Sequence, residues 1–306
     1  MKIYNFGSIN VDYVYAVDSI VRPGETISAL GMQSFPGGKG ANQTVAISRA
    51  GSEVIHVGQV GKDTEWMKEV LAKEGADVSN VLVAEDVPGG CAIIQVEKSG
   101  QNSIIVLGGT NQCMPESLVE NVLSSASAGE WVTLQNEINL TPLVMKAAKA
   151  HGLKVCFNPS PLTDAVVRYP LDCVELLMVN EGEATTLAGL ADGSAPEAAA
   201  RAIYARYSTP IICITLGGKG AMLFQNGGNA VRQDAFSVKA VDTTGAGDTF
   251  TGYLLAGISQ GLDIKEALRR AALAAAISVS RNGAIPSIPF AKEVDTFNGT
   301  DGTKAI

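Results

Sequence analysis

Short apolar segments alternate with amphipathic segments along most of the chain. Some apolar segments have the length and β-branched character of buried strands, at residues 2–7, 53–58, 130–135, 153–158, 174–180 and 210–217. Between them, apolar residues recur three and four positions apart at 64–75, 141–152 and 196–207, which predicts amphipathic helices. This alternation predicts an α/β fold with a mostly parallel sheet covered by helices on both faces.

Two regions break the alternation. Residues 90–108 form two alternating segments joined at 98–102, which predicts a hairpin without a helix. Residues 11–17 and 25–35 have a similar extended character. Strands without helices inside an α/β body predict a small separate sheet, suited to cap a site or to pair two chains.

Composition narrows the class of protein. Of 306 residues, 46% are hydrophobic, and 23 basic against 31 acidic side chains leave a formal charge of -8. This balance argues against a nucleic-acid or membrane surface, because both require an excess of basic residues. No apolar run of signal-peptide length precedes Asp12 and no run reaches about eighteen residues, so we expect a cytoplasmic protein.

The cysteines and histidines offer little chemistry. The five cysteines are widely spaced and lack any C-x-x-C pattern, which favours buried free thiols over disulfides or a zinc site. Only two histidines are present. We expect His56, in a β-branched run, to be a core residue and His151, just before Gly152, to lie at a helix end. Neither has a neighbouring motif that supports a catalytic triad.

A glycine-rich turn near the C-terminus is the strongest candidate for chemistry. The stretch AVDTTGAGDTF at 240–250 follows an extended run at 235–242 and leads into a helical pattern. Residues 245–247 therefore form the turn at a helix N-terminus, where unpaired N–H groups and the helix dipole favour an anion. Asp248 lies in the first helical turn, and it is either a helix-start acid favoured by the dipole or a catalytic base.

Other phosphate-binding patterns are absent. The Gly-Lys pairs ending at Lys39, Lys62 and Lys219 lack both the upstream glycine and the following Ser or Thr of a P-loop. The dinucleotide pattern is also missing after the first strand, where Gly7 stands alone, so NAD binding is a weak alternative.

A second glycine cluster, at 36–51, opens another helix and places Asn42 in its first turn. Asn10 and Asp12 follow the first predicted strand. Singly, each is a common turn former. Because ligands of α/β sheets bind beyond the carboxyl ends of the strands, these short polar groups together suit sugar hydroxyls.

The two glycine clusters resemble the signatures of a known family. PGGKGAN and DTTGAGDTF are similar to the N-terminal and C-terminal signatures of the ribokinase (PfkB) family of carbohydrate kinases. GSINVD, PGET, GGKGANQ, NPSP and RNGAIPSIP extend the resemblance in order from Gly7 to Pro289, and they are most similar to its ribose-phosphorylating members.

The resemblance implies a fold and an activity. It implies one Rossmann-like α/β domain over 1–306 with a discontinuous β-sheet lid from about 11–17, 25–35, 90–97 and 102–108. It also implies ATP, Mg2+ and K+ as cofactors, a homodimer through the lid, and phosphorylation of the 5-hydroxyl of D-ribose. Kinases for deoxyribose, another sugar or a nucleoside remain open, as does a sugar-binding regulator without catalysis.

The resemblance also implies roles for individual residues. Asp248 is the catalytic base, and the amides of the turn that hold the transferring phosphate belong to Gly245, Ala246 and Gly247. The implied sugar ligands are Asn10, Asp12, Gly38, Lys39, Asn42 and Glu137. The implied ATP and Mg2+ residues are Asn180, Glu183, Thr215, Gly217 and Gly220. The implied potassium site, largely of backbone oxygens, comprises Asp242, Thr244, Ser278, Arg281, Gly283 and Ser287. In one departure, Ala272 replaces a larger polar residue that relatives often carry beside the adenine.

Overall fold

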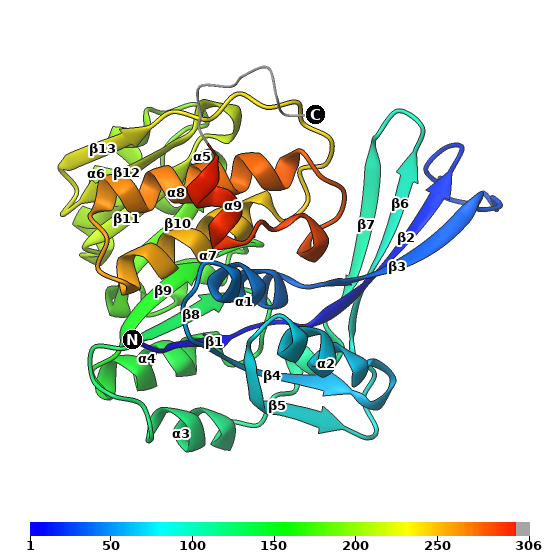
Figure 1. The fold of residues 1–306 in the computed structure, drawn as a ribbon, viewed down its shortest axis with the longest axis horizontal. Coiled ribbons are helices and arrows are strands. Elements are labelled where there is room, and N and C mark those ends of the chain that lie inside the picture. Colours follow the sequence, from blue (N-terminus) through cyan, green and yellow to red (C-terminus); the bar gives the residue numbers. More distant parts are fainter. Residues whose placement is uncertain (298–306) are drawn as a thin grey trace.

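The computed structural model describes residues 1–297, which form a large sheet between two layers of helices and a small separate sheet (Figure 1). The large sheet has nine strands in the order β13-β12-β11-β10-β9-β8-β1-β4-β5. Its strands are parallel except for the antiparallel pairs β11–β12 and β12–β13. The predicted fold class is therefore confirmed.

All six strands predicted from apolar segments belong to the large sheet. Its members are β1 (Ile3–Phe6), β4 (Val54–Gly61), β5 (Asp77–Ala84), β8 (Trp131–Gln135), β9 (Lys154–Asn158), β10 (Val174–Asn180), β11 (Ile211–Thr215), β12 (Ala221–Gln225) and β13 (Asn229–Gln233). The prediction missed β5, β12 and β13. β5 is an edge strand with polar residues on its exposed side. β12 and β13 form a hairpin through Asn226 and Gly227, both with positive φ, and this Asn-Gly turn was an unused signal.

The helices divide between the two faces of the large sheet. One face carries α1 (Lys39–Arg49), α2 (Trp66–Lys73), α7 (Ala246–Ser259), α8 (Ile264–Val279) and α9 (Ala291–Thr296). The other carries α3 (Ser117–Leu123), α4 (Thr141–Ala150), α5 (Glu181–Ala188) and α6 (Pro196–Tyr207). Successive strand residues point to opposite faces, so Leu176 joins the first core and Leu177 the second. Burial on both faces explains the continuous apolar character of these strands.

The small sheet stands to one side of the body in Figure 1. Its order is β3 (Gly31–Gly37), β2 (Asn10–Val17), β6 (Gly90–Glu97) and β7 (Asn102–Leu107). The expected strand at 25–35 is wrong at its start, because Pro23 and Gly24 make a turn closed by the Glu25 N–H donating to the Arg22 carbonyl. The expected extended run at 235–242 pairs with no strand in the described part of the chain.

Two glycines bring α1 close to its neighbours. A Cβ at Gly252 of α7 would lie 2.4 Å from the Cβ of Ala46 on α1, so α1 and α7 touch at distances that larger side chains would prevent. A Cβ at Gly40 would lie 2.5 Å from Cα of Gly7, where α1 begins against the end of β1. The position of α1 thus depends on small residues at both contacts.

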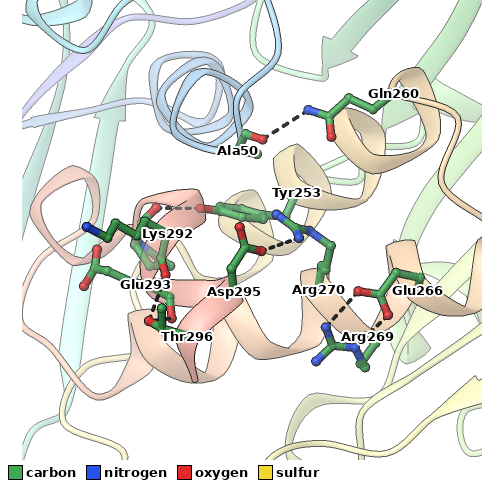
Figure 2. Close-up of polar contacts among 11 residues, drawn as sticks. Ala50, Tyr253, Gln260, Glu266, Arg269, Arg270, Lys292, Glu293, Asp295 and Thr296 are labelled. Carbon is green, nitrogen blue, oxygen red and sulfur yellow. Dashed lines mark hydrogen bonds and ion pairs between the residues drawn. The ribbon is translucent and has the colours of Figure 1, made fainter. Parts of the chain in front are cut away.

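Polar contacts fasten the C-terminal elements around α7 (Figure 2). The hydroxyl of Tyr253 donates to the carbonyl of Pro289 at 2.7 Å. Arg270 of α8 forms an ion pair with Asp295 of α9. Gln260, which follows α7, donates to the carbonyl of Ala50 at the end of α1. The middle and the C-terminal end of α7 are therefore tied to different neighbours.

The remaining predictions about single residues can be compared with the structure. His56 is fully buried in β4, and burial lowers its pKa to about 4. His151 forms the C-cap of α4. Both predicted positions are confirmed. All five cysteines are free thiols, but only Cys156 and Cys213 are buried, and Cys113 is exposed. Within residues 1–297, no helix combines the length and apolar character that a membrane span requires.

We expect Gly252→Ala to lower the free energy of unfolding by about 1–3 kcal/mol, because the added Cβ overpacks the α1–α7 contact. Urea denaturation measures the change. Gly182→Ala is the matched control, since its nearest neighbour beyond the helix is 3.5 Å from the added Cβ and alanine is the better helix former. A Gly252→Ala protein as stable as the Gly182→Ala protein would contradict the expected overpacking.

Candidate active site

Polar side chains gather at the carboxyl ends of the parallel strands. The chain leaves β1 for β4 and β5 on one side and later returns to β8 on the other, so β1 and β8 flank the point where the strand order reverses. Ligands of doubly wound sheets bind at such a point. The polar residues that end successive strands there are Gln135, Asn158, Asn180 and Thr215.

A cavity of about 240 Å³ opens at these strand ends. It is lined by predicted residues from several groups, namely Lys39, Asn180, Glu183, Thr215, Gly245, Gly247 and Asp248. Lys39 was predicted among the sugar ligands, yet it lines this cavity together with the predicted base and the ATP residues. Asn158, which the prediction missed, contributes to the same wall.

A second cavity of about 680 Å³ continues from the first. The two share Thr215, Thr243 and Gly247, so they meet at the N-terminus of α7. The walls of the second cavity are mostly small or apolar and include Gly217, Gly220, Phe236, Val238, Ala272 and Ala276. Ala272 thus lies in this wall, which suits a flat apolar ring more than a charged group.

The N-terminus of α7 presents unpaired amides to both cavities. Gly245 is the N-cap, with a φ of 72° that suits glycine. The N–H of Ala246 donates to the carbonyl of Thr243, whereas those of Gly247 and Asp248 have no acceptor among residues 1–297. Free amides at the positive end of a helix dipole form an anion site.

Asp248 is held through both carboxylate oxygens and is 7% exposed. Asn42 Nδ2 donates to Oδ2 at 3.0 Å. Gln43 Nε2 donates to Oδ1 at the same distance. Two consecutive residues of α1 therefore fix a carboxylate on α7. The prediction had missed Gln43, although it lies within the GGKGANQ motif.

Lys39 is the positive centre of the cavity. The pKa of its ammonium is raised, chiefly by Asp248 and less by Glu137, Glu183 and Asp12, against the lowering effect of burial. It forms no ion pair or side-chain hydrogen bond with any other described residue. A charged ammonium without a direct partner, facing an anion site, suits a ligand phosphate.

Asn10 and Asp12 lie at the base of the small sheet. They belong to β2, which agrees with Asp12 in the expected segment 11–17. β1 already ends at Phe6, before the stretch from Gly7 to Asp12 that was expected at its end. Gly37 and Gly90 pair with Asn10 on either side. A Cβ at either glycine would lie 2.2 Å from the Asp12 or Asn10 side chain, so the glycines make room for these groups. Burial, followed by the charges of Glu137 and Asp248, raises the pKa of Asp12 to about 6.

Further polar residues support the predicted sugar ligands. Glu137, whose pKa is raised mainly by burial, accepts hydrogen bonds from Ser8 Oγ and from the Lys39 N–H. Asn111 Nδ2 donates to Asn10 Oδ1 at 2.8 Å, while Asn111 Oδ1 accepts from the Ile9 N–H. The prediction missed Ser8 and Asn111, whose partners lie about a hundred residues away in the sequence.

One buried atom lacks a partner beside these residues. Asn42 is 6% exposed, and its Oδ1 has no hydrogen-bond donor among the described residues. An unpaired buried carbonyl of this kind costs about 1–3 kcal/mol. A ligand hydroxyl would remove that cost, which fits the predicted role of Asn42 in sugar binding.

Asn180 and Glu183 are engaged with each other at the start of α5. Asn180 Oδ1 accepts from the Glu183 N–H, and Glu183 Oε2 accepts from the Asn180 N–H, forming a capping box. Both residues line the first cavity. The cap fixes the Glu183 carboxylate at the edge of this cavity.

The residues predicted for potassium form two clusters. The Asp242 carboxylate accepts from the N–H and hydroxyl of Thr244 and from the N–H of Gly283; these bonds outweigh burial and lower its pKa. Separately, the hydroxyls of Ser278 and Ser287 are 2.7 Å apart. Arg281, the sixth predicted residue, pairs its side chain with Glu293. Among residues 1–297, no group of three or more His, Cys, Asp and Glu side chains forms a metal cluster.

The cation residues border the anion site. A Cβ at Gly245 would lie 3.2 Å from the Cβ of Ala284, so the segment after Gly283 packs directly on the helix N-cap. The Asp242 carboxylate ties the segment before the cap to the same loop. Any group that orders this loop also orders the N-terminus of α7.

Comparison with known proteins gives the family. The chain is 35% identical to the ribokinase of Haemophilus influenzae, covering 95% of this chain and 96% of that protein. It is 32% identical to the deoxyribokinase of Salmonella typhi, covering 97% and 98%. The structure of Arabidopsis thaliana ribokinase complexed with ribose and ATP superposes with a TM-score of 0.83 at 32% identity, covering 95% and 96%.

The family match spans nearly the whole described chain. Residues 2–291 match the pfkB family of carbohydrate kinases, so the match includes both glycine clusters and the strand ends between them. The family named from the two signatures is thereby confirmed. The chain belongs to the pfkB family of carbohydrate kinases, which are phosphotransferases with an alcohol acceptor.

Proposed function

We propose that the protein transfers the terminal phosphoryl group of ATP to the 5-hydroxyl of D-ribose. One observation carries the proposal: Asp248, with its carboxylate, and the unpaired amides of Gly247 and Asp248 belong to the wall of the same cavity. The predicted sugar ligand Asn42 contacts this carboxylate, and the larger second cavity, of a size for a nucleotide, adjoins the first at Gly247. The ribokinase relatives, one of which is complexed with ribose and ATP, support the choice of substrates.

The residues divide the work of phosphoryl transfer. Asp248 accepts the proton of the attacking hydroxyl, a step required only late, once the oxygen is bonding to phosphorus. The α7 amides and Lys39 hold the transferring phosphate and its developing charge. The second cavity takes the adenine and ribose of the nucleotide, with Thr215, Gly217 and Gly220 in its wall.

Ribose is favoured over deoxyribose by the unpaired polar groups of the sugar residues. Asn42 Oδ1 has no partner among the described residues, and a site built to bond a hydroxyl penalises its absence strongly. The deoxyribokinase relative makes deoxyribose the second candidate. Turnover of a panel of ribose, deoxyribose, fructose and adenosine, followed by ADP release, separates them; preference for any sugar but ribose would overturn the proposed substrate.

Two cations are proposed with the nucleotide. Glu183 fits Mg2+, because Mg2+ commonly binds through one or two carboxylates together with water and substrate phosphates. At this place Mg2+ would neutralise negative charge on the phosphates. For K+, the proposal rests on the Asp242–Gly283 link, which holds two segments together beside the α7 N-cap.

A homodimer through the small sheet is the proposed assembly. Neighbouring residues of the edge strand β7 are exposed on both faces, with Ile104 at 53%, Ile105 at 62% and Val106 at 58%. An apolar edge strand of this kind is prone to pair with another chain. Because β2 of the same sheet carries Asn10 and Asp12, the proposed contact and these sugar ligands belong to one small sheet, with β6 between β2 and β7.

We expect Asp248→Asn to lower kcat by about 10²–10⁴-fold, the usual contribution of a general base, with ribose affinity largely kept. The amide is nearly isosteric and can still accept a hydrogen bond from α1 at the helix start, so a merely structural acid predicts a small change. Coupled ADP detection gives kcat and calorimetry gives the ribose Kd. A kcat within a few-fold of wild type, in a cooperatively folded variant, would assign the base elsewhere.

We expect activity to rise with K+ when the buffer otherwise contains only tetramethylammonium. A cation at the loop orders the α7 N-terminus and adds to its positive field. Asp242→Asn, which weakens the link to Gly283, is expected to reduce the response to K+. Equal initial rates with and without K+ would refute the potassium site.

We expect light scattering to give the wild-type protein a molar mass twice that of its 31.7 kDa chain, and to give the Ile105→Asp protein the mass of a single chain. The charged side chain would be buried without a partner in the proposed contact. Glu97→Asp, at the far end of the neighbouring strand β6, is the control that keeps the charge unchanged. A wild-type protein of single-chain mass at assay concentration would contradict the dimer.

A further inference from the structure

A row of buried polar side chains leads away from Asp248 into the body of the protein. Gln135 Nε2 donates to Gln43 Oε1 at 2.7 Å and to Asn5 Oδ1 at 3.1 Å. Asn5 Nδ2 in turn donates to the Gly40 carbonyl at 2.8 Å. Gln43, Gln135 and Asn5, which we name the amide row, are each at most 1% exposed. The amide row joins α1, β8 and β1, three elements distant in sequence.

The orientation of each amide in the row follows from its fixed ends. The carbonyl of Gly40 only accepts, so Asn5 directs its nitrogen there and its oxygen toward Gln135. Gln135 therefore donates to both neighbours, which makes the Gln43 oxygen an acceptor and turns the Gln43 nitrogen toward Asp248. Both ends require the same sequence of donors and acceptors, so reversing one amide would break bonds at two places.

His56, the titratable group at the far end of the amide row, does not change its charge near neutral pH. Asn5 Nδ2 also donates to Thr44 Oγ1, which lies 2.7 Å from His56 Nδ1. Since Thr44 accepts from Asn5, its hydroxyl donates to Nδ1, and the proton of His56 resides on Nε2, 3.2 Å from the Gly7 carbonyl. Burial lowers the pKa of His56 to about 4, so the ring is neutral near neutral pH.

We propose that Gln43 is a positioning residue for Asp248, and that the amide row fixes its orientation. Gln43 and Asn42 each hold one carboxylate oxygen from α1, which prevents rotation of the carboxylate and leaves its remaining lone pairs for the substrate hydroxyl. The inference rests on the proposed role of Asp248 as base. In the proposed role, Gln43 contacts neither the sugar nor the nucleotide and acts only through Asp248.

Stability alone does not require such a row. Buried amides offer no advantage over well-packed apolar side chains unless each bond is satisfied, and Gln135 Oε1 has no partner among the described residues. Every bond that sets the direction of Gln43 is nevertheless made. A small misplacement of a catalytic group costs up to about 10²-fold in rate, which gives the row a catalytic benefit.

Gln43→Met tests the proposal, because methionine keeps the length of the side chain and removes both hydrogen-bonding atoms. We expect kcat for ribose to fall about 10–100-fold, while KM for ATP and the calorimetric Kd for ribose change less than about threefold. Gln59→Met is the matched control. Gln59 is a buried glutamine of β4, 7% exposed, and its side chain makes no hydrogen bond to the residues of the site. We expect its kcat to stay within twofold of wild type.

A second variant covers a failure to fold. Gln135→Met leaves every contact of Asp248 in place. It frees the orientation of Gln43 and removes one bond to Asn5, which lies farther from Asp248, so a several-fold loss of kcat with unchanged ribose Kd supports the row. If either folded variant keeps the wild-type kcat while Asp248→Asn loses it, the positioning role is overturned and the proposed function stands. If wild-type protein turns over another acceptor in the panel instead of ribose, the substrate proposal fails, and the same comparison with that acceptor still decides the role of Gln43.

Discussion

The close contact between α1 and α7 is the constraint on which the site depends. Asp248 starts α7, and its two oxygens are held by Asn42 and Gln43 of α1. One helical turn further along both helices, Gly252 meets Ala46 at a distance that excludes any larger side chain. The anion site and the carboxylate belong to α7, and two of the proposed sugar ligands, Lys39 and Asn42, belong to α1. Their separation is therefore set by a packing contact outside the cavity.

The large sheet supplies the second half of the arrangement. Because its strands run parallel, their carboxyl ends lie at one edge and bring Asn158, Asn180 and Thr215 to the same cavity. The small sheet approaches this edge where β2 begins, at Asn10, and where β3 ends, at Gly37, directly before α1. The proposed sugar site thus lies where the two sheets and α1 meet, and the proposed dimer contact lies on the same small sheet.

Local patterns predicted the parts of the fold that are buried on both faces, and they predicted the helix N-terminus around Gly245 because glycine, threonine and aspartate mark such a turn. They failed where the environment is decided at long range. The edge strand β5 shows no continuous apolar run, because one side faces solvent. The break between β1 and β2 has no local signal beyond Gly7, so the sequence did not show that Asn10 already belongs to β2 of the small sheet.

The candidate site shows the same division. The two glycine clusters are short and local, and the family resemblance located their polar residues without the structure. The amide row joins residues 5, 43 and 135, and its meaning depends on partners that only the folded chain brings together. Glutamine in a buried helix turn and at the end of an apolar strand was the available signal, since a buried amide needs partners. Sequence periodicity does not identify those partners.

The charges of the site explain why a nucleotide should bind together with cations. Four carboxylates act on Lys39, those of Asp248, Glu137, Glu183 and Asp12, and that lysine with the α7 N-terminus provides the positive charge facing the first cavity. The helix terminus contributes roughly half a unit charge. The four carboxylates therefore exceed the positive charge around the cavity. A triphosphate would add more negative charge, and its repulsion by the carboxylates is strong where water is displaced. Because the proposed base must lie beside the incoming phosphate, the excess of negative charge cannot be removed by moving Asp248 away. Cations that arrive with the nucleotide or lie beside the α7 turn have to balance this negative charge. The proposed cation sites are therefore linked to the position of the proposed base.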